Sequence, residues 1–210
     1  MIAAIYTIPK RFELMRALKD KIKPSVDEVR IFMDGDYRGN WWNHQRTLSE
    51  MLPLAKKDEP VLIMTDDVTT VPDWRERWEK IHEAAGSEIY CLFTRKRHLF
   101  KEENLKRGFV TGVHLRGFYD QATIYINRPS LINDVIKWFN ETGKQTKPFL
   151  PPLEKRGNHL DVVIQEYLVA HNIEWTVTVP TLFDHLQVGS SLGHDIGGSP
   201  LYIGNHEDLS

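Results

Sequence analysis

The chain has 210 residues, and its 27 Lys and Arg against 29 Asp and Glu give a formal net charge of −2. This length is that of one ordinary domain, spanning residues 1–210, which can bury a core without a disulfide or a structural metal. Hydrophobic residues make up 41% and charged residues 27% of the sequence, which excludes a disordered chain. The single cysteine, Cys91, excludes a disulfide framework and lies in an apolar run typical of a buried thiol.

Strand and helix signals alternate in the first half of the chain. Short apolar runs predict strands over residues 2–8, 29–33, 61–64 and 89–93. Apolar residues at helical spacing predict helices between them, over residues 12–22, 48–55 and 74–85. This alternation predicts an α/β fold with a mostly parallel central sheet flanked by helices.

The second half departs from this alternation. It opens with a polar segment, residues 95–107, that contains six Lys or Arg. Strands are predicted over residues 109–115, 122–126 and 174–179, with helices around 131–138 and 160–171 and a Pro/Gly/Lys loop over 143–157. From residue 180 on there is no apolar periodicity, so an irregular tail is expected. The first apolar run is too short to cross a membrane, and we expect a cytoplasmic protein without membrane attachment.

Carboxylates directly follow two of the predicted strands. Asp66 and Asp67 come after residues 61–65, and Asp34 and Asp36 come after residues 31–33. Ligands of open α/β sheets bind beyond the carboxyl ends of the strands, and oxygen ligands suit Mg²⁺ or Mn²⁺, which can neutralise a diphosphate. The alternative is that both pairs only cap or form turns. Phosphate-binding glycine motifs are absent, so a nucleotide here requires metal and side chains.

Three segments resemble a known family. The run Val61-Leu-Ile-Met-Thr-Asp-Asp-Val68 resembles the aspartate signature of nucleotide-sugar-dependent glycosyltransferases of the GT-A fold. Residues 179–193, where a proline-led strand runs into a histidine and a serine pair, are similar to the closing segment of small, bacteriophage-like members. Tyr6-Thr-Ile-Pro-Lys-Arg11 looks like their first strand and nucleotide loop. The resemblance implies a GT-A-like fold with a nucleotide-sugar half (1–94), an acceptor-side half (95–195) and a tail (196–210).

The same resemblance implies roles for individual residues. It implies Mn²⁺ or Mg²⁺ as cofactor and a nucleotide-sugar donor, with a UDP-sugar favoured. The metal is assigned to Asp67, with Asp66 beside it and His185 as a C-terminal ligand. The donor is placed near Thr7, Pro9, Arg11, Asp34, Arg46 and Asp66. The family signature has one residue between its two aspartates, a spacing found in Asp34-Gly-Asp36 but not in Asp66-Asp67, so both metal positions stay open.

Asp161 stands at the start of the predicted helix that carries Ile164 and Tyr167. Family members often keep an acidic general base there, so the resemblance implies that Asp161 deprotonates the acceptor hydroxyl in an inverting transfer. The alternative is a favourable interaction with the helix dipole alone. Glu166, one turn later, is predicted to be a solvated charge.

The basic segment bears on the acceptor. Lys and Arg contact phosphates, and small phage-like transferases include ones that glycosylate modified bases, so a hydroxylated base in DNA is one acceptor hypothesis. Its contacts are Arg95, Lys96, Arg97, Lys101, Lys106 and Arg107. The alternatives are a solvated loop, a glycan or lipopolysaccharide acceptor, and a noncatalytic nucleic-acid-binding module that also uses Trp41-Trp42. Gly189-Ser-Ser-Leu-Gly193 matches a serine-hydrolase elbow, but only a short tail follows it.

Overall fold

The computed structural model describes residues 1–36, 46, 47, 49–51, 53, 59–112, 123–142 and 160–186, without the side chains of residues 139, 140, 142 and 160–163. Trp41-Trp42, the predicted loop over 143–157 and the segment Gly189–Gly193 lie outside the described residues. The predicted helix over 48–55 lies partly inside them, and residues 46, 47, 49–51 and 53 have helical backbone.

Seven strands of the described chain form one sheet in the order β2-β1-β3-β7-β5-β8-β6. Their bounds are β1 Ile2–Thr7, β2 Glu28–Met33, β3 Val61–Thr65, β5 Ile89–Cys91, β6 Phe109–Gly112, β7 Thr123–Ile126 and β8 Trp175–Thr178. The pairings make five strands point one way and only β6 and β7 the other. The predicted α/β class with a mostly parallel sheet is confirmed.

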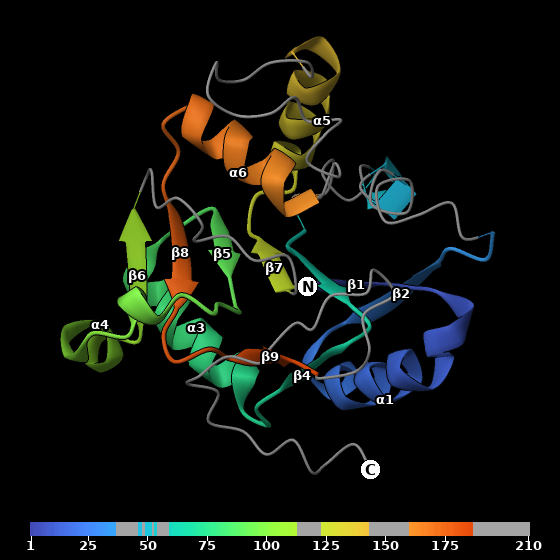
Figure 1. Ribbon diagram of the computed structural model, residues 1–210, viewed down its shortest axis with the longest axis horizontal. Coiled ribbons are helices and arrows are strands. Elements are labelled where there is room, and N and C mark those ends of the chain that lie inside the picture. The colour runs from blue at the N-terminus through green and yellow to red at the C-terminus, as the bar shows by residue number, and fades with distance from the viewer. Residues whose placement is uncertain are drawn as a thin grey trace.

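Helices cover both faces of this sheet (Figure 1). α1 (Phe12–Ile22) and α3 (Trp74–Ala85) lie on one face, and α5 (Ser130–Thr142) and α6 (Leu160–Ala170) lie on the other. The short helix α4 (Glu102–Arg107) lies by the β6 edge, and 3₁₀ turns η1, η2 and η3 cover Pro9–Arg11, Lys23–Ser25 and Arg97–Leu99. In the described residues, no helix is long and apolar enough to span a membrane.

The two covered faces explain the continuous apolar runs of the central strands. Side chains alternate along a strand, so Ala4 and Tyr6 of β1 join the core under α5 and α6, whereas Ala3 and Ile5 join the core under α1 and α3. A strand buried on both sides has no polar face to alternate with. This is why β1 reads as an unbroken apolar segment.

A second, two-stranded sheet was not predicted. β4 (Val68–Thr70) pairs antiparallel with β9 (Phe183–His185), with Val68 opposite His185. The expectation of an irregular chain from residue 180 is therefore wrong over β9. Three-residue strands are too short to give a periodic signal, and their pairing joins segments more than 110 residues apart.

Two further expectations are corrected. Glu166 is not a solvated charge, because only 8% of it is exposed. Its helix α6 packs against α5 as well as the sheet, so more than one face of it is covered. Phe12 belongs to the apolar spacing of α1, yet it is 47% exposed, whereas Met15, Leu18 and Ile22 are buried.

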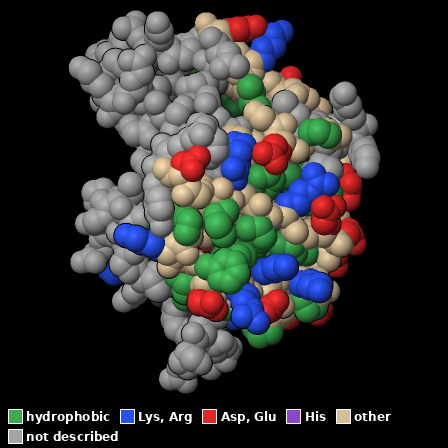
Figure 2. All heavy atoms as spheres, turned by 90° about the vertical axis from the view of Figure 1, so that its right-hand side faces the viewer, with side chains coloured by type: hydrophobic (Ala, Val, Ile, Leu, Met, Phe, Trp, Pro, Cys, Tyr) green, Lys and Arg blue, Asp and Glu red, His purple; other side chains and the backbone are tan. Residues whose placement is uncertain are grey.

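The β2 edge combines apolar and charged side chains. Figure 2 looks onto this edge and α1, and it shows hydrophobic side chains gathered at the centre with charged ones around them. Arg30 Nε donates to Glu28 Oε1 at 2.7 Å on this edge strand. Charged side chains on an edge strand discourage pairing with a strand of another molecule.

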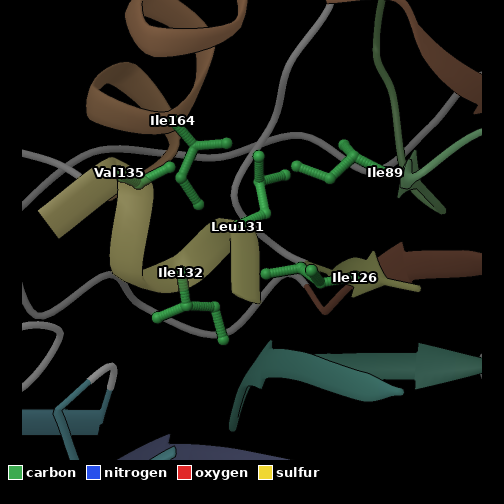
Figure 3. Close-up of a pocket in the computed structure, with 6 residues that line it drawn as sticks. All are labelled: Ile89, Ile126, Leu131, Ile132, Val135 and Ile164. Atoms are coloured by element: carbon green, nitrogen blue, oxygen red, sulfur yellow. The ribbon is translucent and has the colours of Figure 1, made fainter. Parts of the chain in front are cut away.

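A small cavity lies between the sheet and helices α5 and α6 (Figure 3). Its volume is about 10 Å³, the space of one water molecule, and it is lined by Ile89, Ile126, Leu131, Ile132, Val135 and Ile164. An apolar void of this size has no group that binds a substrate or holds a water. We interpret it as a packing defect.

Tyr90 provides a test of the core. Its hydroxyl accepts the Ser87 N–H at 2.8 Å and lies 2.7 Å from His82 Nδ1, and burial raises the pKa of Tyr90 to about 12. Tyr90→Phe leaves the Ser87 N–H without its acceptor and should lower the free energy of unfolding by about 1–3 kcal/mol in urea denaturation. Tyr125→Phe is the control, because the Tyr125 hydroxyl makes no hydrogen bond in the described part of the chain. Equal losses for the two variants would contradict this account.

Candidate functional site

The carboxyl ends of β1, β2 and β3 meet at one edge of the sheet. Their parallel register brings Thr7, at the end of β1, beside Met33 of β2, and Tyr6 beside Thr65 of β3. Thr7 Oγ1 donates to Asp66 Oδ2 at 2.5 Å, and the Thr7 carbonyl accepts the Asp34 N–H at 2.9 Å. The end of β1 therefore stands between the two predicted acidic segments.

Arg11 connects the two aspartates that follow β3. The chain turns at Ile8 into η1, where the Arg11 N–H donates to the Ile8 carbonyl at 2.9 Å. From there Arg11 Nη1 donates to Asp66 Oδ1 at 3.0 Å and to Asp67 Oδ2 at 2.5 Å. The three side chains are only 14%, 4% and 7% exposed. Salt screens ion pairs at such low exposure far less than surface pairs.

Burial sets the electrostatics of this cluster. It raises the pKa of Asp66 above the ordinary value, and the charge of Asp67 adds to the rise, while the hydrogen bond from Thr7 and the Arg11 charge oppose it. Burial by itself would lower the pKa of Arg11, but the charges of Asp67 and Asp66 outweigh it and the pKa is raised. Arg11 is thus the cation that offsets two buried acids.

The β4–β9 pair brings His185 to Asp67. The Leu186 N–H donates to the Asp67 carbonyl at 2.8 Å, and His185 Nε2 lies 3.4 Å from Asp67 Oδ1. His185 Nδ1 lies 3.2 Å from the Leu186 carbonyl, an acceptor only, so Nδ1 is the donor there. In the neutral ring, Nε2 then presents a lone pair towards Asp67 Oδ1. That oxygen is buried and accepts no hydrogen bond within the described part of the chain.

With the His185 ring neutral, two lone pairs face each other across 3.4 Å, an arrangement that suits a cation. Neighbouring ligands of an octahedral ion bound at 2.0–2.1 Å lie roughly 3 Å apart. Asp67 and His185 therefore fit as two ligands, but no group of three or more His, Cys, Asp or Glu in the described residues is arranged to hold a metal.

The other predicted donor residues lie at the same edge. Arg46 Nη2 donates to the Met33 carbonyl at 3.0 Å, which ties Arg46 to the end of β2. Asp34 is 1% exposed, whereas Asp36 is exposed, and Pro9 is exposed at the start of η1. Asp161 is the second residue of α6, and its side chain lies outside the described residues.

One residue of the site carries no predicted role. The Phe93 ring centroid lies 6.0 Å from that of His185, so Phe93 contacts the proposed ligand. The predicted strand over 89–93 ends at Cys91. The Leu92 carbonyl then accepts hydrogen bonds from the N–H groups of Leu182 and Phe183, both at 3.1 Å, which ties Leu92 to the start of β9. The sequence carried one signal of this role: the apolar run over 89–93 is longer than the strand that it forms, Ile89–Cys91.

The basic segment begins two residues after Phe93 and contains ordered structure, η3 and α4. Leu99 is buried, and its carbonyl accepts from Asn104 Nδ2 at 2.8 Å. Lys106 pairs with Glu102 at 2.6 Å, and the Arg107 guanidinium lies 4.3 Å from the centroid of its neighbour Phe109. The exposed charges nearest in sequence to Phe93 are those of Arg95 and Arg97.

Comparison with models of known protein families finds no match for this chain, and comparison with curated protein sequences finds none. Among solved structures, the chain is similar to the galactosyltransferase LgtC in complex with donor and acceptor sugar analogues, at 10% identity and a TM-score of 0.44 over 81% of this chain and 70% of that one. It is also similar to residues 1–349 of S. aureus TarS, at 12% identity and a TM-score of 0.45 over 87% of this chain. The chain spans 58% of that TarS structure. Both TM-scores lie below 0.5.

Thr7→Val tests the electrostatics of this site. A raised pKa means that folded Asp66 holds its proton more tightly than unfolded Asp66, so stability falls as the pH rises from about 3.9 to the raised pKa. Without the Thr7 hydroxyl this window should extend further upward, with a further loss of about 1.5–3 kcal/mol at neutral pH. Urea denaturation from pH 4 to pH 8 measures it.

The Asp66→Asn background is the matched control, because it has no carboxylate to titrate at this position. There Thr7→Val should leave the pH dependence of stability unchanged. The same pH-dependent loss in both backgrounds would contradict the assigned hydrogen bond.

Proposed function

We propose that this protein is a GT-A-type glycosyltransferase that moves a sugar from a nucleotide-sugar donor to an acceptor hydroxyl. The observation that carries the proposal is the cluster of Arg11, Asp66, Asp67 and His185 at the carboxyl ends of parallel strands, where open α/β sheets bind ligands. The family-like segment 61–68 ends at the first residue of β4, the family-like segment 179–193 contains β9, and these two strands pair with each other. That pairing supports the resemblance, since the family's metal ligands come from the same two segments.

A divalent ion fits this site best at Asp67 and His185. Both oxygens of Asp66 already accept hydrogen bonds, from Arg11 and Thr7, which makes Asp66 a positioning residue. Few protein ligands are needed where donor phosphates and water complete the coordination. An imidazole ligand favours Mn²⁺ over the harder Mg²⁺. When bound, the ion supplies positive charge for the departing diphosphate.

The donor lies along the ends of β1 and β2 in this proposal. Thr7, Pro9 and Asp34 border the nucleotide, with a UDP-sugar favoured, and Arg46 contacts the donor from its anchor on the Met33 carbonyl. Asp161, in the first turn of α6, is the general base that takes the proton of the acceptor hydroxyl in an inverting reaction. The helix dipole favours the ionised form of a carboxylate at that position.

The acceptor in this proposal is a hydroxylated base in DNA, of the kind that bacteriophages carry. The contact between Phe93 and His185 supports this acceptor, because Phe93 lies two residues before the basic segment and His185 is a proposed metal ligand. Arg95, Lys96, Arg97 and Lys101, which lie nearest to Phe93 in the sequence, are the main phosphate contacts, and Lys106 and Arg107 lie further along the chain. A glycan or lipopolysaccharide acceptor and a noncatalytic nucleic-acid-binding module are outcomes that the tests below separate.

Asp67→Asn tests the metal and the donor together. Thermal-shift measurements with UDP, GDP or CDP should show metal-dependent stabilisation of the wild type by about 2.7 kcal/mol at 100 times the dissociation constant. The variant should fold but lose the metal-dependent part, because it loses the anionic oxygen that faces His185. If Asp67→Asn binds Mn²⁺ and nucleotide as the wild type does, the metal site is wrongly assigned and Asp34 and Asp36 become its candidate ligands.

Asp161→Asn is the companion variant. It should bind donor and Mn²⁺ as the wild type does and transfer sugar about 10²-fold more slowly, the scale of a lost general base. An undiminished transfer rate would exclude Asp161 as the base and point to a retaining mechanism or another residue.

A triple change, Arg95, Lys96 and Arg97 to Ser, tests the acceptor. Duplex binding should weaken at every sequence, and the slope of log affinity against log salt should become shallower by about 0.9 for each phosphate that the variant no longer neutralises. The change of Lys106 and Arg107 to Ser is the control, with a smaller expected effect because these two residues lie furthest from Phe93 along the basic segment. If the wild type does not bind DNA with hydroxylated bases, a glycan acceptor is favoured. If it binds DNA equally well with and without Mn²⁺ and nucleotide, the noncatalytic module is favoured.

A further inference from the structure

We propose that Arg11 is an internal cation that competes with the divalent ion for Asp67 and is transferred to the donor diphosphate when metal and donor bind together. This inference rests on the proposed function, since it concerns the same metal and donor. It makes metal binding depend on the donor, so that the metal alone binds weakly and the metal with a nucleoside diphosphate binds tightly.

The geometry of Arg11 is the first step. One atom, Nη1, makes both contacts, at 3.0 Å to Asp66 and 2.5 Å to Asp67. Two adjacent carboxylates this well buried repel each other and lose hydration, so they require a cation between them. A divalent ion would supply the same charge. Arg11 therefore holds the site together while the metal is absent.

The two oxygens of Asp67 are the second step. Arg11 takes Oδ2, whereas Oδ1 faces His185 Nε2 and has no other described partner. A metal ion at Asp67 Oδ1 and the Arg11 guanidinium at Asp67 Oδ2 would share the negative charge of one carboxylate, and the two cations would repel each other. Each cation therefore weakens the hold of the other, which is a coupling free energy between two ligands of one group.

The donor relieves this conflict. A diphosphate brings negative charge to the edge where Arg11 and the metal meet, and a guanidinium matches phosphate oxygens with a fork of N–H donors. Arg11 can then exchange a carboxylate for a phosphate without leaving a buried charge unpaired. By reciprocity, Mn²⁺ tightens nucleoside diphosphate binding as much as the nucleoside diphosphate tightens Mn²⁺ binding.

Calorimetric titration of Mn²⁺, without and with UDP, tests the proposal on the full chain. Arg11→Met keeps the length of the side chain and removes its charge, so Mn²⁺ alone should bind about tenfold more tightly or better, the scale of one charge-assisted hydrogen bond. The factor by which UDP tightens Mn²⁺ should shrink in the same variant. Arg16→Met, which removes an exposed charge from α1, should leave both quantities unchanged. Adding Asp67→Asn to Arg11→Met should abolish the tight Mn²⁺ site.

Unchanged or weaker binding of Mn²⁺ alone to Arg11→Met would overturn the proposal and reduce Arg11 to a structural ion-pair partner. If Arg11→Met does not fold, Arg11→Gln takes its place, because a neutral amide removes the charge but still donates hydrogen bonds to the two carboxylates. Mn²⁺ alone should then bind more tightly than to the wild type, and weaker binding overturns the proposal. A wild type that binds no nucleoside diphosphate would instead contradict the proposed glycosyl transfer, whereas tighter Mn²⁺ binding by Arg11→Met would still support the competition.

Discussion

The bridge from Arg11 to Asp66 and Asp67 is the interaction on which the rest of the site depends. Two neighbouring carboxylates, only 4% and 7% exposed, cannot both stay ionised without a cation beside them. One guanidinium nitrogen meets both, and the Thr7 hydroxyl satisfies the remaining oxygen of Asp66. One oxygen of Asp67 is left to face His185. The two oxygens of Asp67 therefore face different partners, Arg11 on one side and His185 on the other.

The fold supplies this arrangement through two simple devices. Parallel strands bring the ends of β1, β2 and β3 to one edge, which sets Thr7 between Asp34 and Asp66. The β4–β9 pair then brings a histidine from the far end of the described chain back to Asp67. Charged side chains therefore gather at the carboxyl ends of the strands, where open α/β sheets bind their ligands.

Much of this was readable from the sequence, and the failures have physical causes. Short apolar runs predicted every strand of the main sheet, because strands covered on both faces are continuously apolar. The rule that ligands bind at strand ends drew attention to Asp66 and Asp67. Apolar periodicity missed β9, because its order comes from pairing with β4 and not from a local pattern. Glu166 was misjudged because single-sequence spacing does not show that α6 is covered by α5. That Arg11 binds the aspartates depends on the turn at Ile8, which spacing alone does not specify.

Anomalous diffraction at the manganese edge, from crystals grown with Mn²⁺ and UDP, tests the central claim most directly. The account predicts one manganese peak between Asp67 Oδ1 and His185 Nε2, with diphosphate oxygens completing its coordination and the Arg11 guanidinium turned to the phosphate. A manganese peak at Asp34 and Asp36, or bound UDP with no manganese beside Asp67, would contradict it.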